Sequence, residues 1–238
     1  MCVKPPAAML ARGMTKGTTA AERAEEESLR LGRLLRLERA LWRAGLTQVA
    51  GVDEVGVGPL AGPVVAAAVV FAPGTGIPGV DDSKRLSHRR REALAEIIRG
   101  RAAGIGIGIG SLEDIARLNI YHAALEAMRR AVEALPRPPE RVLVDARTIP
   151  GLAMPQDAYV KGDGLSFCIA AASIVAKTHR DRLMTELDGA YPGYGFASHK
   201  GYDTPAHRAA LTRLGPCPAH RMSYRTVRDL CGAPGEAG

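Results

Sequence analysis

Leucines and charged residues interleave between residues 21 and 44, and their spacing predicts an amphipathic helix over this range. Gly45 would end that helix, because glycine is common just past a helix C-terminus. Glutamates stand among the arginines of this segment, so we expect a solvated charged face rather than a nucleic-acid contact. These arginines are Arg30, Arg33, Arg36, Arg39 and Arg43.

Two apolar runs follow, residues 48–53 and 62–71, with a turn rich in glycine and proline between them. Their β-branched residues predict two strands. A third strand is predicted over residues 104–110, where isoleucine alternates with glycine. A strand that lacks every second side chain loses packing unless something else fills the space, so a helix or another backbone should approach this face closely.

The second half of the chain predicts further elements. Ser111 and Asp114 have the spacing of a capping box, with aspartate where glutamate or glutamine is usual, so a helix should begin there and continue through residues 119–135. Two short strands are predicted in "RVLVDAR" and "DAYVKGD". Residues 165–187 predict a long helix buried against the sheet, because the first half of the segment is apolar on nearly all sides.

The order of these elements predicts the fold class. Three strands in series precede a helix, two strands and a long helix, which indicates an α/β domain with a mixed sheet flanked by helices. Thr204 suits an N-cap and Pro205 suits the first helical position, so a small helical region should follow.

Composition and charge narrow the class of protein. The chain has 238 residues, 46% of them hydrophobic, and can bury a substantial core. Its 32 lysines and arginines exceed its 25 acidic residues, and the net charge of +7 favours a polyanion such as nucleic acid as partner, although many basic proteins bind none. No apolar run is long enough for a membrane span and no signal peptide is recognisable, so we expect a cytoplasmic protein that contacts no membrane.

The cysteines add one constraint. They are far apart in the sequence and form no CxxC pair, so neither a zinc site nor a disulfide framework is predicted. A reducing compartment fits this spacing. The four positions are Cys2, Cys168, Cys217 and Cys231.

Four carboxylates fall where predicted strands end or turn, namely those of Asp53, Glu54, Asp145 and Asp163. Strand ends on one edge of a sheet converge, and like charges gathered there repel unless a cation lies between them. Oxygen ligands without histidine or cysteine select Mg²⁺ or Mn²⁺, and two such ions about 4 Å apart are a common device for displacement at a phosphodiester. One such aspartate alone would more often be a turn residue, but Asp53 and Glu54 are adjacent, and a buried carboxylate without a cation or donor is costly.

A dinucleotide-binding site is the rival interpretation of the same stretch. Gly56, Gly58 and Ala61 match the fingerprint GxGxxA, and Asp81 and Asp82 lie downstream at about the required distance. The fingerprint must open a helix, whereas prolines and β-branched residues follow here and predict a strand. The two acids before the turn would also repel a pyrophosphate.

Several blocks of the sequence resemble ribonuclease HII in their order and content. They are "GVDEVGVGPLAGPVVAAAVVF", "DDSKRLS", "LVDAR", "YVKGDGLSFCIAAASIVAKTHRDRLM" and "YGFASHKGYDTPAHRAALTRLGPCPAHRMSY", and they span about residues 48–224. The resemblance implies an RNase H-like mixed sheet flanked by helices. We expect an RNase H-like catalytic domain with the N-terminal helix (21–203) and a C-terminal helical region (204–231). The composition of the two ends, without periodicity, predicts a disordered N-terminal extension (1–20) and a tail (232–238).

The resemblance also implies an activity and a set of site residues. The activity is endonucleolytic cleavage of the RNA strand of RNA–DNA hybrids, and of DNA on the 5′ side of an embedded ribonucleotide, leaving 3′-hydroxyl and 5′-phosphate ends. The family's four acidic metal ligands fall on the four carboxylates named above. Lys84 and Lys161 are candidate phosphate contacts, and Tyr202 matches the tyrosine that packs on the sugar beside the ribonucleotide.

The ribose-reading turn departs from the family at one position. The family's Gly-Arg-Gly falls on Gly56, Val57 and Gly58, so a guanidinium is missing. In the family that the chain resembles, backbone groups of the turn largely meet the 2′-hydroxyl. Val57 should therefore leave the chemistry intact while weakening binding or relaxing the choice of ribose. The alternative is a catalytically impaired hybrid-binding protein.

The remaining expectations concern neighbours and partners. Arg180 and Asp181 should form a structural pair near the site. His199 and His220 should have capping or core roles and not bind metal. We expect a monomer, and the C-terminal "CGAPGEAG" shows no clear motif for binding a clamp protein.

Overall fold

The computed structural model describes residues 19–230 of the chain. The expected disorder of the first 18 residues and of the tail from residue 232 falls outside the described residues, as do Cys2 and Cys231. Thr19 and Ala20 belong to the first helix instead of to the extension, because the Thr19 hydroxyl accepts a hydrogen bond from the Glu22 amide and caps that helix.

A five-stranded sheet of order β3-β2-β1-β4-β5 forms the centre of the molecule. β1 pairs antiparallel with β2 and parallel with β4, while β2–β3 is antiparallel and β4–β5 is parallel, so the sheet is mixed as predicted. The strands are β1 (Val49–Val55), β2 (Val64–Val70), β3 (Gly104–Gly110), β4 (Arg141–Asp145) and β5 (Gln156–Tyr159).

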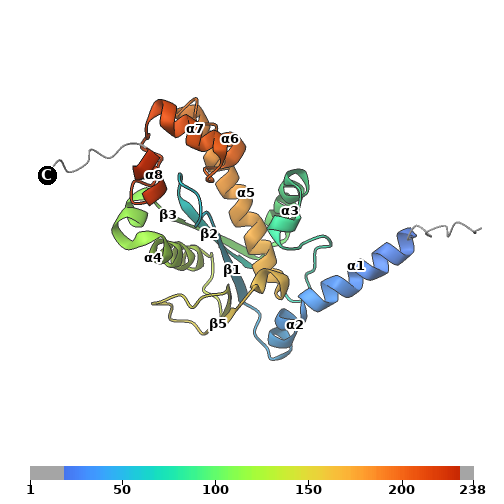
Figure 1. Ribbon diagram of the computed structural model, residues 1–238. Coiled ribbons are helices and arrows are strands. Elements are labelled where there is room, and N and C mark those ends of the chain that lie inside the picture. Colours follow the sequence, from blue (N-terminus) through green and yellow to red (C-terminus); the bar gives the residue numbers. More distant parts are fainter. Residues whose placement is uncertain (1–18, 231–238) are drawn as a thin grey trace, which may run out of the picture.

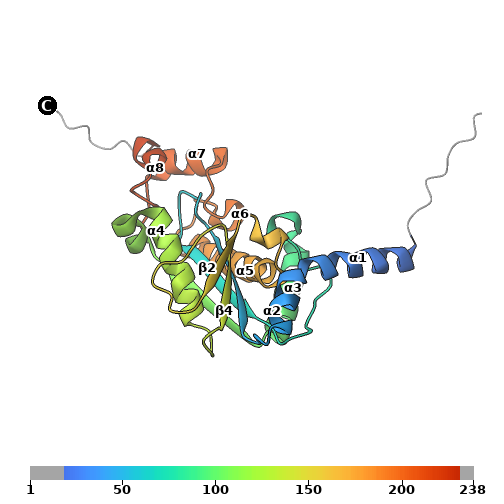
Figure 2. The same cartoon turned by 90° about the horizontal axis from the view of Figure 1, so that it is seen from below.

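Helices cover both faces of this sheet (Figures 1 and 2). α5 (Phe167–Ala190) lies against β1 and β2 on one face, and α4 (Leu112–Glu133) lies against β2 and β3 on the other. Every residue of β2 is buried, because its alternate side chains enter the two separate cores that α5 and α4 form with the sheet. The predicted long buried helix is confirmed.

The alternating glycines of β3 let α4 come unusually close. A Cβ atom on Gly106 would lie 2.0 Å from the carbonyl oxygen of Ala131, and one on Gly108 would lie 1.9 Å from that of Ala127. Both distances are far below van der Waals contact, so the helix backbone occupies the space that side chains would need. The expected close approach is confirmed.

α4 begins as predicted and contains one break. Ser111 and Asp114 form a capping box, each side chain accepting the other's backbone N–H. Asn119 has a φ of 66°, and its side-chain oxygen accepts hydrogen bonds from the amides of Tyr121 and His122. Asn119 therefore restarts the helix at the residue where the sequence predicted the second segment.

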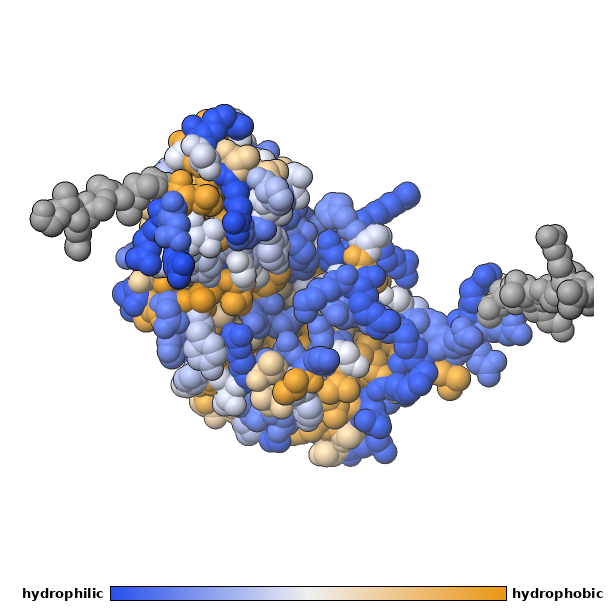
Figure 3. Space-filling view, in the orientation of Figure 1, coloured by the Kyte–Doolittle hydropathy of each residue, from blue (hydrophilic) through white to orange (hydrophobic). Residues whose placement is uncertain are grey.

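The single helix predicted for residues 21–44 is wrong, because the segment forms α1 (Ala20–Leu34) and α2 (Arg36–Arg43) with a break at Leu35. The leucines at the end of α1 pack on the core beneath α5, whereas those of α2 pack on a cluster around β1 and β4. One straight helix could not reach both. Gly45 ends α2 with a φ of 91°, as predicted, and hydrophilic side chains cover most of the projecting α1 (Figure 3).

α3 (His88–Arg101) was not predicted, although its start and its buried face are visible in the sequence. The Ser87 hydroxyl accepts from the Arg90 amide, and Leu94 and Ile98 enter the core beside α5. The short helix η1 (Ser83–Arg85) precedes it and carries Lys84 toward the end of β1.

Three further helices complete the described chain: α6 (Phe196–His199), α7 (Pro205–Leu214) and α8 (Arg225–Leu230). Thr204 caps α7 and Pro205 takes its first position, as predicted. Small cores join these helices to the turn after β1 and to α5. Across residues 19–230 no helix is both long and apolar enough to cross a membrane.

Candidate active site

Three neighbouring segments bring the four predicted acids to one edge of the sheet. Asp53 and Glu54 lie near the end of β1, and Asp145 is the last residue of β4, its parallel neighbour. Asp163 lies in η2 (Gly162–Gly164), the helical turn after β5. Because adjacent parallel strands end at the same edge, residues far apart in the sequence meet here.

Burial and mutual repulsion dominate the electrostatics of this edge. Burial raises the pKa of Asp53 well above its usual value, and the charges of Glu54, Asp145 and Asp163 raise it further. Burial also raises the pKa of Glu54 and of Asp163. The site therefore resists holding all of its negative charge unless positive charge enters.

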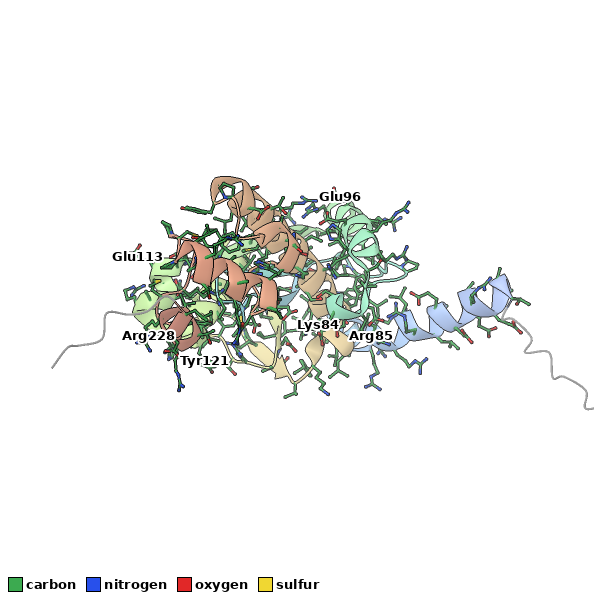
Figure 4. All side chains as sticks on the ribbon, turned by 45° about the horizontal axis from the view of Figure 1, so that its top comes forward. Lys84, Arg85, Glu96, Glu113, Tyr121 and Arg228 are labelled. Atoms are coloured by element: carbon green, nitrogen blue, oxygen red, sulfur yellow. The ribbon has the colours of Figure 1, made fainter. Side chains whose placement is uncertain are left out.

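Two positively charged side chains, Arg147 and Lys84, offset part of the negative charge of the acids. Arg147 lies 3.6 Å from the Oε1 of Glu54, and this charge opposes the rise in the pKa of Glu54. Lys84 Nζ lies 3.6 Å from Asp163 Oδ2 and acts in the same way on Asp163. Lys84 is exposed, and Figure 4 shows it beside Arg85, which lies on the side nearer α1.

The carboxylate oxygens fit a hard divalent cation. The Oε2 atom of Glu54 is buried without a hydrogen-bond partner, which is costly unless another donor or an ion meets it. Asp145 Oδ1 accepts from the Gly162 amide at 2.6 Å, so its second oxygen remains for another ligand. Within residues 19–230, no three acidic, histidine or cysteine side chains already surround one point in ligating geometry, so binding would require side-chain rotation.

A small cavity of about 80 Å³ joins the acids to the predicted sugar contact. Asp53, Glu54, Lys84 and Tyr202 all line it, so the structure brings these four predicted residues together. The other lining residues are Val55, Ser83, Arg91, Ser173 and Lys177.

Lys177 is the most informative of the unpredicted residues. Its ammonium donates to Asp181 Oδ1 at 2.6 Å and lies 5.9 Å from the centre of the Tyr202 ring. Burial lowers the pKa of Lys177, because the charged ammonium is less well solvated here than in water. Its place one turn before Asp181 on α5 was the available signal.

The predicted pair of Arg180 with Asp181 is wrong. Asp181 pairs with Lys177 and lies 3.7 Å from Arg91 of α3. Arg180 instead donates to backbone carbonyls of the loops before β2 and after α6. Consecutive helical residues project in different directions, which is why the two side chains part.

The remaining predicted substrate residues lie around the acids. Gly56 has a φ of 94°, and a Cβ there would lie 2.2 Å from the Nε atom of Arg180, so only glycine fits this turn. Tyr202 is 40% exposed and can offer its ring to a ligand. Lys161 is exposed, with a φ of 58°, and makes no ion pair within residues 19–230.

Histidines support the loop that carries Tyr202. The Nδ1 atom of His207 lies 2.9 Å from the Tyr202 carbonyl oxygen, and its Nε2 atom lies 3.1 Å from the Nε2 atom of His220. Burial lowers the pKa of both histidines, that of His220 to about 4. His199 bonds to the Tyr194 carbonyl, so both predicted histidines hold backbone, in keeping with the capping or core role expected for them.

Comparison with known proteins agrees with this architecture. The sequence profile of ribonuclease HII matches residues 50–227. Ribonuclease HII of Myxococcus xanthus is 53% identical over 214 residues, which cover 90% of this chain and 73% of that protein.

Solved structures share the fold. Ribonuclease H2 from Pyrococcus horikoshii superposes with a TM-score of 0.65 at 26% identity, covering 76% of this chain and 96% of that one. The RNase HII of the PCNA:RNase HII complex from Archaeoglobus fulgidus gives 0.58 at 27% identity with the same coverage. The chain therefore belongs to the ribonuclease HII family and is a type 2 ribonuclease H, a phosphodiester hydrolase that acts on RNA–DNA hybrids.

Proposed function

We propose that this ribonuclease H is a metal-dependent endonuclease that also incises duplex DNA on the 5′ side of an embedded ribonucleotide, leaving 3′-hydroxyl and 5′-phosphate ends. The observation that carries the proposal is the cluster of buried, mutually repelling carboxylates at adjacent strand ends. Such a cluster has no structural use that would repay its repulsion, whereas a bound cation turns the repulsion into affinity.

Asp53, Glu54, Asp145 and Asp163 would hold one or two Mg²⁺ or Mn²⁺ ions. When bound, such ions supply an activated water and stabilise the charge that develops on the phosphate. The chain's part is to fix the ligands: β1 and β4 hold two of them in register, and the Gly162 amide orients Asp145. Lys84 and Arg147, which now face the acids, are free to turn toward the phosphate once positive charge replaces them.

The substrate would be placed by the glycine turn and by Tyr202. Within residues 19–230 the amides of Gly56, Val57 and Gly58 have no protein acceptor, so they can donate to a ribose hydroxyl. Tyr202 lines the cavity beside Asp53 and Glu54 and would stack on the neighbouring sugar. Lys84 and Lys161 would contact phosphates beside the cut.

The alternative of an impaired binding protein has no support in these observations. All four acids are in place, and the turn keeps its two glycines. Val57 would then alter affinity more than chemistry, because the side chain at this position is not among the groups that reach the acids.

The test uses a labelled DNA duplex with one ribonucleotide, an all-DNA duplex and a full hybrid, each with Mg²⁺, Mn²⁺ or a chelator. We expect metal-dependent incision 5′ to the ribose, cleavage of the hybrid and no cut in the all-DNA duplex. Cleavage of the hybrid alone would remove the junction activity from the proposal. Equal cleavage in chelator would overturn the metal site.

A further inference from the structure

Two buried arginines lie directly behind the glycine turn. Arg221 donates from Nη2 to the Gly56 carbonyl at 2.5 Å, from Nη1 to the Val57 carbonyl at 2.9 Å and from Nε to the Gly62 carbonyl at 2.9 Å. Arg180 donates to the carbonyls of Ala61 and Pro63 in the same turn. Together they bind the turn at both ends.

Neither guanidinium forms an ion pair within residues 19–230, although both side chains are almost wholly buried. Burial and the repulsion between them lower the pKa of Arg180 to about 10, and burial lowers that of Arg221. An unpaired buried charge is costly, so its presence at this place needs a reason beyond packing.

The direction of the bonds to Arg221 supplies that reason. Each trans peptide points its C=O and its N–H in opposite directions, and the described chain has no cis peptide. Because the carbonyls of Gly56 and Val57 point at Arg221, the N–H groups of Val57 and Gly58 must point away from it. Those are two of the amides that lack a protein acceptor.

The side chain at position 57 takes no part in this arrangement. The Val57 side chain is partly buried against the core beneath α4. The Tyr224 hydroxyl donates to the Val57 carbonyl at 2.8 Å and accepts from Arg221. The shape of the turn is thus held through its carbonyls, whichever side chain it carries.

We propose that Arg221, supported by Tyr224, is the positioning residue for ribose selectivity: it fixes the two peptides of the turn so that their N–H groups face the 2′-hydroxyl. This inference rests on the proposed function. It also revises the expectation for Val57, because an arginine at position 57 would add charge without reorienting the turn.

Arg180 extends the same arrangement to the second substrate contact. Its Nη1 donates to the Lys200 carbonyl at 3.0 Å, and its guanidinium lies 5.9 Å from the centre of the Tyr202 ring. The turn and the Tyr202 loop are therefore tied to one side chain. A change at Arg180 would disturb both contacts, which makes Arg221 the cleaner probe.

The decisive quantity is the ratio of two dissociation constants, for all-DNA duplex and for duplex with one ribonucleotide, measured by fluorescence anisotropy in chelator so that neither is cut. We expect Arg221→Lys, which keeps the charge and loses the fork, to lower this ratio about tenfold. Val57→Arg should tighten both duplexes alike and leave the ratio unchanged. Arg225→Lys, an exposed change on α8, is the matched control.

A merely structural role for Arg221 would reduce the fraction of active protein but not the ratio. If Arg221→Lys binds with the ratio of the unmodified chain, the inference is overturned. If that variant does not fold, Tyr224→Phe provides the test, and we expect it to lower the ratio of dissociation constants two- to threefold. An unchanged ratio in Tyr224→Phe would also overturn the inference. No preference in the unmodified chain would overturn the proposed function itself, and with it this inference.

Discussion

The acid cluster and the glycine turn lie side by side and treat charge in opposite ways. At the strand ends, carboxylates repel one another and one buried oxygen has no partner. Behind the turn, every guanidinium nitrogen of Arg180 and Arg221 donates to a carbonyl. The difference indicates two roles for buried charge. Carboxylates without enough partners mark the place where ions and phosphate bind, whereas guanidinium groups with all their hydrogen bonds made hold the backbone in one conformation.

Asp53→Asn is expected to give the largest effect. It should lower the rate of hybrid cleavage by roughly a hundredfold to a thousandfold, since a group acting on the charged transition state is lost. It should also raise the melting temperature in chelator, because a buried repelling charge is removed. Cleavage assays and thermal melts measure both.

Asp229→Asn, on the exposed face of α8, is the control for this prediction and should change neither quantity noticeably. A loss of activity in Asp53→Asn together with a lower melting temperature would contradict the picture of an electrostatically strained site.

Metal binding should stabilise the folded chain through the same cluster. At a Mn²⁺ concentration a hundredfold above its dissociation constant, the expected gain in the free energy of unfolding is about 2.7 kcal/mol. Asp53→Asn should lose most of that gain. Equal stabilisation of both proteins in thermal melts would place the ion elsewhere.

Gly108→Ala tests whether stability and selectivity are separate. The added methyl would collide with the Ala127 carbonyl, and we expect a loss of about 1–3 kcal/mol in the free energy of unfolding. Gly100→Ala in α3 has open space and should gain up to about 1 kcal/mol. Denaturant titrations measure both, and the ratio of dissociation constants should stay unchanged in either variant.

The histidines that support the Tyr202 loop and the acid cluster should affect the pH dependence of stability with opposite sign. The pKa of His220 is lowered from 6.5 to about 4 in the folded chain. As the pH drops, His220 therefore binds a proton in the unfolded chain before it does so in the folded chain, and stability should fall from about pH 6.5 toward pH 4. The pKa of Asp53 is raised in the folded chain. Its protonation therefore adds to the free energy of unfolding at low pH, and this contribution is lost as the pH rises through the pKa of the folded state.

Thermal melts across this pH range should show the slope near pH 5 reduced in His220→Gln. Asp53→Asn should instead remove the opposing contribution and steepen the slope. An unchanged profile in His220→Gln would mean that the pair of histidines does not control this transition.

Local signals in the sequence were sufficient for most of the fold. The alternation of isoleucine and glycine predicted β3 and the helix packed closely against it. Ser111 and Thr204 predicted the N-terminal caps of α4 and α7. The break at Leu35 could not be found in this way, because no glycine or proline marks it and two separate cores impose it. α3 was missed although Ser87 and the spacing of Leu94 and Ile98 announced it.

The site shows the same division. The four carboxylates could be proposed as metal ligands because each one is an acidic residue at the end of a predicted strand or in a turn. The roles of Lys177 and Arg221 could not, since a lysine or arginine in a helix or loop usually faces water, and only the folded chain shows what each one reaches. The expected partner of Arg180 was wrong for the same reason.

The parallel pairing of β1 with β4 has a consequence for synthesis of the protein. Asp53 and Asp145 become neighbours only after the intervening segments have folded around β2, and Arg221 reaches the turn later still in chain order. A growing chain on the ribosome thus carries its first two acids long before it can assemble a cutting site. Cleavage of RNA–DNA hybrids should therefore arise only once the segment that carries Arg221 has been made and has folded.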